Sequence, residues 1–271
     1  MKRPYVAVAL VAASALALSA CANNSGAAST SSSTAAGGVS LVSPGNLTVC
    51  THLSYKPFQF TEGGTIVGFD VDVMDLVAKK LGVTQQVIDI EFGQITSGAV
   101  FTAKKCDVGA AAITITPERE QAAPFSDPYF ASKQALLVKA DSSVTSLADM
   151  KDKVLAVQTD TSGQTYAEEH AGEFGFSTKV FDDMPTGSNA VLAGTVDGSL
   201  NDNGVLLDFA RENPTTKVVE EIDTNEHYGF NVSKDNPALL TAINEVLKES
   251  KADGSFNTIY KKWFGVDAPT A

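Results

Sequence analysis

Histidine and cysteine are scarce in this chain, and acidic residues outnumber basic ones. The three histidines lie far apart, at positions with no metal-binding spacing: His52, His170 and His227. Asp and Glu number 32 against 20 Lys and Arg, a formal net charge of −12, which argues against nucleic acid and anionic lipid as ligands. The sequence also lacks a phosphate-binding loop, a metal-binding motif and a nucleophile–base constellation, so we expect no cofactor and no enzymatic activity.

Long apolar runs are missing beyond residue 20, so we expect no membrane-spanning helix in the body of the protein. Within residues 1–20, Lys2 and Arg3 precede an apolar segment, and this pattern is typical of a secretory signal peptide. Its end, Leu18-Ser19-Ala20-Cys21, resembles the lipobox of a bacterial lipoprotein signal peptide. That resemblance implies cleavage before Cys21 and lipid attachment to Cys21. An ordinary secretory peptide with an accidental cysteine is the alternative.

Residues 21–44 are rich in Ser, Thr, Ala, Asn and Gly and show no apolar periodicity. Such a segment cannot bury a core, so we expect a flexible linker. The mature protein is then a globular body held at the extracytoplasmic face of the cell membrane by a lipid on Cys21. A Gram-positive surface and a periplasm both remain open.

Two cysteines remain once Cys21 is assigned to lipid attachment. Outside the cytoplasm, a pair such as Cys50 and Cys106 most often forms a disulfide. Both residues lie beside predicted strands of the same half of the body, which permits pairing without proving it. Two buried thiols are the alternative.

Two successive units of alternating strands and helices make up the body. In the first unit, three strands alternate with two helices: 47–51, 70–81, 87–90, 97–105 and 107–113. The second unit has strands and helices at 135–139, 154–158, 163 onward, 179–181, 188–194, 198–200, 205–212, 217–220 and 228–232, before two C-terminal helices. This order predicts an α/β fold with mainly parallel sheets and a ligand site at the carboxyl ends of the strands.

The segment from Thr114 to Arg119 places an arginine in the first turn of a predicted helix. Thr116 has the properties of an N-cap and Pro117 those of the first helical residue. A cation at a helix start is disfavoured by roughly 0.3 kcal/mol unless an anion lies close by. Because an arginine fork suits a carboxylate, Arg119 is a candidate anion-binding residue. A surface ion pair with a neighbouring glutamate is the alternative.

Seven short runs follow one another over residues 46–265, and the ordered set is specific although each run alone is weak. They are Tyr55-Lys56-Pro57-Phe58-Gln59-Phe60, Gly68-Phe69-Asp70-Val71-Asp72, Thr114-Ile115-Thr116-Pro117-Glu118-Arg119, Phe125-Ser126-Asp127-Pro128-Tyr129-Phe130, Ser146-Leu147-Ala148-Asp149, Ala252-Asp253-Gly254-Ser255-Phe256 and Ile259-Tyr260-Lys261-Lys262-Trp263-Phe264-Gly265. In this order the body resembles the amino-acid-binding proteins of bacterial ABC importers, the polar-amino-acid group of solute-binding family 3. The resemblance implies a two-lobed, periplasmic-binding-protein-like (type II) fold with a two-stranded hinge that closes on a ligand. Lobe 1 would comprise residues 45–132 and 227–271, and lobe 2 residues 133–226.

The resemblance also implies how the ligand's charged groups are held. Arg119 and Thr114 would bind the α-carboxylate of a free amino acid. The carbonyl of Ala112 would accept a hydrogen bond from the α-ammonium, and Asp202 would pair with its charge. Taken alone, Asp202 is typical of a turn and Thr114 of a strand end.

Lobe 2 would contribute a loop between residues 158 and 163. There the backbone N–H groups of Thr161 and Ser162 would reach the carboxylate from the other side. Asp160 departs from the family, which often has glycine at this place. Asp tolerates a positive φ better than most residues, but its carboxylate would repel an anionic ligand unless it points away.

Five further residues would surround the rest of the ligand. Tyr55 would pack on it, and Phe92 would do so from the opposite wall. Gln158 and Asn201 would line the end that holds the ligand's side chain. His52 is a second departure, since several relatives carry an acidic residue there, and a histidine can donate or accept. A plain core position for Phe92 and an exposed loop position for His52 are the alternatives.

These roles predict a monomeric lipoprotein that captures a free amino acid, more readily a polar one, and delivers it to the permease and ATPase subunits of an ABC transporter. Two other functions could use the same fold. One is a dehydratase of prephenate or arogenate, for which His52 or Asp160 would have to act as acid or base. The other is a sensory lipoprotein without a transporter. Neutral polar, acidic and basic amino acids all remain open as ligands.

Overall fold

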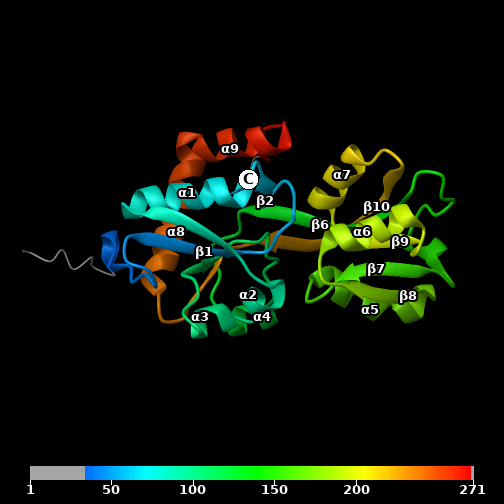
Figure 1. Cartoon of the computed structure of the whole chain (residues 1–271), viewed down its shortest axis with the longest axis horizontal. Coiled ribbons are helices and arrows are strands. Elements are labelled where there is room, and N and C mark those ends of the chain that lie inside the picture. Colours follow the sequence, from blue (N-terminus) through cyan, green and yellow to red (C-terminus); the bar gives the residue numbers. More distant parts are fainter. Residues whose placement is uncertain (1–33, 270–271) are drawn as a thin grey trace, which may run out of the picture. The chain divides into compact units, whose positions relative to one another are not determined.

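A computed structural model describes residues 34–269 of the chain. The expected signal peptide and its lipidation site, Cys21, lie outside these residues. Within them, no helix combines the length and the apolar character needed to cross a membrane. The described chain forms a four-stranded sheet, a five-stranded sheet and a separate two-stranded hairpin. We call the part built on the four-stranded sheet lobe 1 and the part built on the five-stranded sheet lobe 2 (Figure 1).

The sheet of lobe 1 has the order β11-β5-β1-β4. Strands β1 (Asn46–Thr51), β4 (Thr84–Asp89) and β5 (Val108–Gly109) are parallel, and β11 (Asn231–Val232) is antiparallel to β5. Figure 1 shows α1 and α9 on one side of β1 and the short helices α2, α3 and α4 on the other. The remaining elements of this lobe are β2 (Phe60–Glu62), β3 (Thr65–Val67), α1 (Phe69–Leu81), α2 (Phe92–Thr96), α3 (Ala99–Thr102), α4 (Pro117–Ala122), α8 (Pro237–Asp253) and α9 (Ser255–Phe264).

Helix α1 follows the predicted pattern and carries much of the core of lobe 1. Its start at Gly68 has a φ of 143°, and a Cβ there would lie 2.0 Å from the carbonyl oxygen of Phe58, so only glycine fits. Gly82 ends the helix in the left-handed region. Phe69 packs edge-on against the buried Phe256 of α9, with the ring centroids 5.5 Å apart, so this residue of the last helix belongs to the core.

Two of the predicted elements of lobe 1 are wrong in extent. Of the helix expected over 97–105 only α3, Ala99–Thr102, is α-helical, and the left-handed Gly98, with a φ of 72°, separates it from α2, which ends at Thr96. The strand expected over 107–113 ends at Gly109. Beyond it the chain leaves the sheet, and Ala112 adopts a φ of 49° while its N–H bonds to the buried carboxylate of Asp70. This loop, residues 110–114, reaches the candidate site.

The sheet of lobe 2 has the order β10-β6-β9-β7-β8. Strands β7 (Val154–Gln158), β8 (Ser177–Phe181) and β9 (Gly198–Asp202) are parallel, whereas β6 (Phe130–Lys139) is antiparallel to β9 and to β10 (Thr216–Tyr228). The helical elements of this lobe are η2 (Leu147–Met150), α5 (Ser162–Phe174), α6 (Met184–Ala193) and α7 (Asn203–Glu212).

Strands β6 and β10 form the connection between the lobes (Figure 1). They pair antiparallel from Phe130 opposite Tyr228 to Lys139 opposite Thr216, with two register shifts, one between Val218 and Glu220 and one between Ile222 and Glu226. The strand predicted over 217–220 is longer, because β10 has 13 residues and reaches Tyr228, and the strand predicted over 228–232 is reduced to β11, Asn231–Val232. This pairing holds the two segments that connect the lobes side by side.

The segment expected to be a flexible linker overlaps the folded body. Val39 and Leu41 are buried in the core cluster of lobe 1, and the backbone N–H of Val42 bonds to Asp107 at 2.8 Å. Asn236 donates to the carbonyl of Ser40, also at 2.8 Å. Residues 39–42 are therefore packed, because their apolar side chains find a surface that a local pattern does not reveal.

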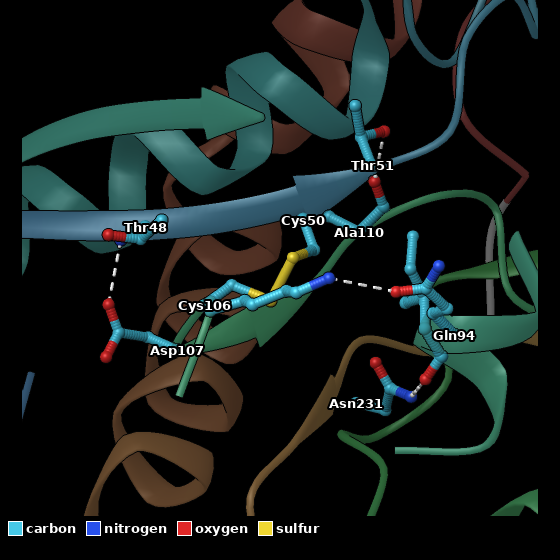
Figure 2. Close-up of a disulfide and its surroundings, with 10 residues drawn as sticks. Thr48, Cys50, Thr51, Gln94, Cys106, Asp107, Ala110 and Asn231 are labelled. Atoms are coloured by element: carbon cyan, nitrogen blue, oxygen red, sulfur yellow. Dashed lines mark hydrogen bonds between the residues drawn. A yellow bond between two sulfur atoms is a disulfide. The ribbon is translucent and has the colours of Figure 1, made fainter. Parts of the chain in front are cut away.

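A disulfide joins Cys50 of β1 to Cys106, with the two Cα atoms 5.8 Å apart (Figure 2). Next to it, the carboxylate of Asp107 accepts a hydrogen bond from the backbone of Thr48. At the other end of the strand, the hydroxyl of Thr51 donates to the carbonyl of Ala110. These bonds tie β1 to the start of the 110–114 loop.

Candidate ligand-binding site

A cavity lies where the carboxyl ends of β1, β7 and β9 meet the 110–114 loop and the start of α5. Its walls come from both lobes: His52, Tyr55, Gln59, Phe92, Ala111, Ala112, Thr114, Arg119, Gln158, Thr161, Ser162 and Asp202. All the residues predicted to bind the ligand line it except Asn201, which bonds to Gln158 at its edge. The centre of a water molecule can occupy a volume of about 10 Å³ in this cavity, so the cavity has room for about one water.

Arg119 lies on the cavity wall at the start of α4. Its backbone N–H bonds to the side chain of Thr116, so Thr116 is the N-cap as predicted. The guanidinium donates to the carbonyls of Thr114 and Asp160, each at 2.8 Å, and stands 5.4 Å from the ring of Phe92. Neither of these guanidinium bonds goes to a carboxylate. Burial lowers the pKa of Arg119, while the charges of Asp202 and Glu226 act in the opposite direction.

A buried carboxylate that does not line the cavity holds the 110–114 loop in place. Asp70 is fully buried and accepts from the N–H of Ala112 and from the hydroxyl of Tyr129, both at 2.8 Å. Burial raises the pKa of Asp70 to about 7, although both hydrogen bonds favour the charged form. Thr114, at the end of the loop, points its hydroxyl across to that of Ser162 at 3.3 Å.

Asp202 presents a second buried carboxylate, this one on the cavity wall. Gln134 donates to it at 2.6 Å, Tyr55 at 2.9 Å, and Tyr228 donates as well. Burial raises the pKa of Asp202, and the three donors and the charge of Arg119 oppose that shift. Tyr55 belongs to lobe 1 and Asp202 to lobe 2, so their bond joins the two lobes across the cavity.

The start of α5 faces the cavity from lobe 2. Thr161 is its N-cap and accepts from the N–H of Gln164. Asp160, just before it, has a φ of 59°, in the left-handed region. Its carboxylate lines a neighbouring groove instead of the cavity, and lies so close over Gly93 that a Cβ there would be 2.1 Å away. An acidic side chain is thus kept away from the candidate anion site.

Sequence reasoning missed Glu226, Gln134 and Gln59. The Glu226 carboxylate accepts from Gln134 at 2.9 Å and lies 3.3 Å from Ser162 and 3.4 Å from Thr114. Burial raises the pKa of Glu226, and the charge of Asp202 adds to the shift. The alternation of side chains along a strand could have indicated Glu226, because residues two apart lie on the same face and Tyr228 is buried.

The far end of the cavity contains amide and imidazole groups. Asn201 donates to the Gln158 side chain at 3.3 Å, and Gln59 donates to the His52 carbonyl at 3.3 Å. His52 is half-buried, with its ring 6.2 Å from the ring of Phe92, so it is not the exposed loop residue of the alternative interpretation. Over residues 34–269, no group of three His, Cys, Asp or Glu side chains could hold a metal ion.

Comparison with known proteins identifies the family of the chain. The profile of the family described as bacterial extracellular solute-binding proteins, family 3, matches residues 47–266. The ABC transporter glutamine-binding protein GlnH of Bacillus subtilis is 36% identical over 210 residues, which cover 75% of this chain and 75% of that protein.

Two solved structures are similar to this one in fold. An ancestral arginine-binding protein bound to arginine has 38% sequence identity and a TM-score of 0.77, covering 81% of this chain and 98% of its own. The ancestral amino acid-binding protein AncCDT-1, a precursor of cyclohexadienyl dehydratase, has 33% identity and a TM-score of 0.74, covering 81% of this chain and 95% of its own. The two-lobed α/β fold expected from the sequence is confirmed.

Proposed function

Because this chain belongs to the bacterial extracellular solute-binding proteins of family 3, we propose that it captures a free amino acid between its lobes and delivers it to an ABC transporter. One observation carries the proposal: a guanidinium, Arg119, and a buried carboxylate, Asp202, line the same small cavity. A zwitterion carries one group of each sign and complements this pair. The names of the relatives are consistent with it, since they include arginine-binding and glutamine-binding proteins.

In this proposal the α-carboxylate binds to Arg119. The guanidinium now donates to two backbone carbonyls, and its planar fork can turn one or both donors to a carboxylate. The hydroxyl of Thr114 and the backbone N–H groups at the start of α5, at Thr161 and Ser162, add donors from both lobes. The Glu226 carboxylate, which lies beside the hydroxyls of Thr114 and Ser162, must yield them to the ligand.

The α-ammonium binds to Asp202 at the other side of the cavity. That carboxylate now accepts from three neutral side chains, and an ammonium supplies both hydrogen bonds and a full countercharge. The carbonyl of Ala112 is a further acceptor on the wall. A buried carboxylate that gains a cation is strongly stabilised, so binding favours the charged form of Asp202.

Binding requires the lobes to separate and close. Room for about one water cannot hold an amino acid, and cross-lobe bonds such as that between Tyr55 and Asp202 must break for a ligand to enter. The paired strands β6 and β10 are the natural hinge for this movement. We therefore propose a closing movement of the two lobes around the amino acid.

We propose that the protein acts outside the cytoplasm, anchored by a lipid on Cys21 as a monomer, and that a permease and an ATPase are its partners. We also propose that it performs no chemistry on its ligand. A dehydratase would need an acid or base in the cavity, and of the two residues considered for this role, Asp160 lines the neighbouring groove and only His52 lines the cavity. Incubation with prephenate or arogenate is expected to give no product above the uncatalysed rate.

A thermal-shift screen with the twenty amino acids, cystine and ornithine tests the proposal. At least one of them is expected to raise the melting temperature by several degrees at millimolar concentration, since a ligand that binds only the folded state stabilises it. Titration calorimetry then gives the stoichiometry, expected to be one per chain. No shift with any amino acid, for a sample that unfolds cooperatively, would contradict the proposal.

A further inference from the structure

Two hydrogen-bond acceptors at one end of the cavity have no partner. The first is Oε1 of Gln59, a side chain that is only 1% exposed. Its Nε2 donates to the carbonyl of His52 at 3.3 Å, which fixes the orientation of the amide. Oε1 is then the free acceptor, and no hydrogen bond reaches it from the described residues.

The second acceptor is Nε2 of His52. Nδ1 of this ring lies 3.1 Å from the carbonyl oxygen of Ile90. A carbonyl can only accept, so Nδ1 carries the proton, and a neutral imidazole then has a lone pair on Nε2. This atom is also buried without a partner among the described residues.

The location of these two acceptors connects them with ligand binding. Other buried oxygens of the described chain, such as Oε1 of Gln85 and Oγ1 of Thr48, also lack a partner, but their residues do not line the cavity. Gln59 and His52 do line it. Buried acceptors in native proteins are almost always paired, so a ligand that supplies donors at this place gains specificity.

We propose that this pair selects amino acids whose side chain ends in a planar N–H donor, an amide or a guanidinium, with arginine and glutamine as the best fits. The inference rests on the proposed function and adds the class of ligand. A carboxylate side chain offers only acceptors, and an aliphatic one leaves both acceptors unpaired. The aromatic rings of Tyr55 and Phe92 on the same walls suit a planar group.

Glutamine and glutamate provide the first test, because their side chains have the same shape but only that of glutamine has N–H donors, whereas the carboxylate of glutamate only accepts. Calorimetric titration at pH 8 is expected to give glutamate a Kd at least 100-fold higher than that of glutamine or arginine. Glutamate or norleucine binding as tightly as both of these would overturn the inference while leaving the proposed function intact. If no amino acid binds at all, the proposed function itself has failed.

The substitution Gln59→Leu provides the second test. It removes the acceptor at similar volume and is expected to raise the Kd for glutamine at least tenfold, with little change for norvaline, which has no side-chain donor. Gln85→Leu is the matched control: it removes a half-buried glutamine that does not line the cavity and whose buried Oε1 also lacks a partner among the described residues, and the Kd is expected to stay unchanged. Wild-type affinity for glutamine in a folded Gln59→Leu protein would refute the role of Gln59.

A third variant covers the possibility that Gln59→Leu does not fold. Gln59→Glu keeps the shape and replaces the amide by a charged acceptor. The ratio of arginine affinity to glutamine affinity is then expected to rise at least tenfold over the wild type. An unchanged ratio would count against the inference, because a charge beside the ligand's side chain must favour a guanidinium.

Discussion

Asp70 of lobe 1 and Asp202 of lobe 2 are both buried carboxylates near the cavity, and the two have different neighbours. Asp70 of lobe 1 accepts from a backbone N–H, that of Ala112, and from Tyr129, and it does not line the cavity. Asp202 of lobe 2 lines the cavity and accepts only from the side chains of other residues. The two carboxylates are similarly buried, so their hydrogen-bond partners determine their roles. Asp70, bonded to a backbone N–H, fixes a loop, whereas the side-chain partners of Asp202 can be exchanged for a ligand.

The same contrast applies to the walls of the two lobes. Lobe 1 presents an irregular loop, which a disulfide, Asp70 and the bond from Thr51 to Ala110 hold in place. Lobe 2 presents the ends of regular strands and the start of α5, which ordinary packing positions. The cavity wall of lobe 1 is therefore positioned by a few specific bonds, and that of lobe 2 by the packing of regular elements. Five predictions test this difference, and the expected effects decrease from the first to the last.

Arg119→Ala is expected to abolish amino-acid binding while the fold survives. The residue is the cation of the cavity wall, and removing one partner of a buried ion pair costs about 3–5 kcal/mol, roughly a 1,000-fold loss of affinity. Calorimetry measures the loss, and circular dichroism with a thermal melt serves as the control. Wild-type affinity in the variant would refute its proposed role in the carboxylate site.

Reduction of the Cys50–Cys106 disulfide is expected to destabilise lobe 1 by about 4 kcal/mol, from the chain entropy of a loop with a sequence separation of 56. Urea unfolding with and without reductant measures the change. The double variant Cys50→Ala/Cys106→Ala is the control and should not respond to reductant. Thiol labelling of the unreduced, unfolded protein should leave both residues unmodified; two reactive thiols would contradict the disulfide.

Asp202→Asn is expected to weaken amino-acid binding about 100-fold, or about 3 kcal/mol, with little effect on folding. The amide keeps an acceptor for its neighbouring donors but removes the charge that an α-ammonium needs. Calorimetry with the best ligand checks the affinity, and urea unfolding checks the stability. A large loss of stability without loss of affinity would mean that Asp202 is structural, like Asp70.

Asp70→Asn is expected to change how stability depends on pH. The folded pKa of Asp70 is raised to about 7 from an ordinary value near 3.9, so the folded state holds the proton more tightly. Its contribution to the free energy of unfolding is largest below about pH 4 and falls as pH rises, by about 2 kcal/mol between pH 5 and 7.

The asparagine variant should lack this decline, because its amide can accept from Ala112 and donate to Tyr129 at every pH. Urea unfolding of both proteins at pH 5, 6, 7 and 8 gives the difference, in which the contributions of other groups cancel. Parallel stability curves for the two proteins would show that Asp70 keeps an ordinary pKa.

Ser146→Ala is expected to destabilise lobe 2 by about 1 kcal/mol without changing affinity. Ser146 and Asp149 form a capping box at the start of η2, far from the cavity lining. Urea unfolding and calorimetry measure the two quantities. A change in ligand affinity would show that the wall of lobe 2 is as sensitive to single bonds as that of lobe 1.

The sequence predicted those parts of the molecule whose signals are local. The helix expected over 70–81 and the N-cap expected at Thr116 both depend on consecutive residues, and α1 and Thr116 lie as expected. The site residues came from a resemblance over the whole body, and ten of the eleven line one cavity.

What the sequence could not predict depends on contacts between distant residues. Ala112 takes a positive φ in a loop tied to Asp70, 42 residues earlier, and the local run of small residues looks like a strand. Val39 and Leu41 are buried in a stretch whose composition suggests a linker. The acceptor pair of Gln59 and His52 emerges only after each hydrogen bond around it is counted.

The near-closed cavity has a kinetic consequence. A ligand enclosed by both lobes cannot leave faster than they part, so the opening rate sets an upper limit on its dissociation rate. Substitutions at the cross-lobe contacts, such as that of Tyr55 with Asp202, should therefore change residence time more than association rate. A membrane partner that holds the lobes apart would then release the cargo without competing for it.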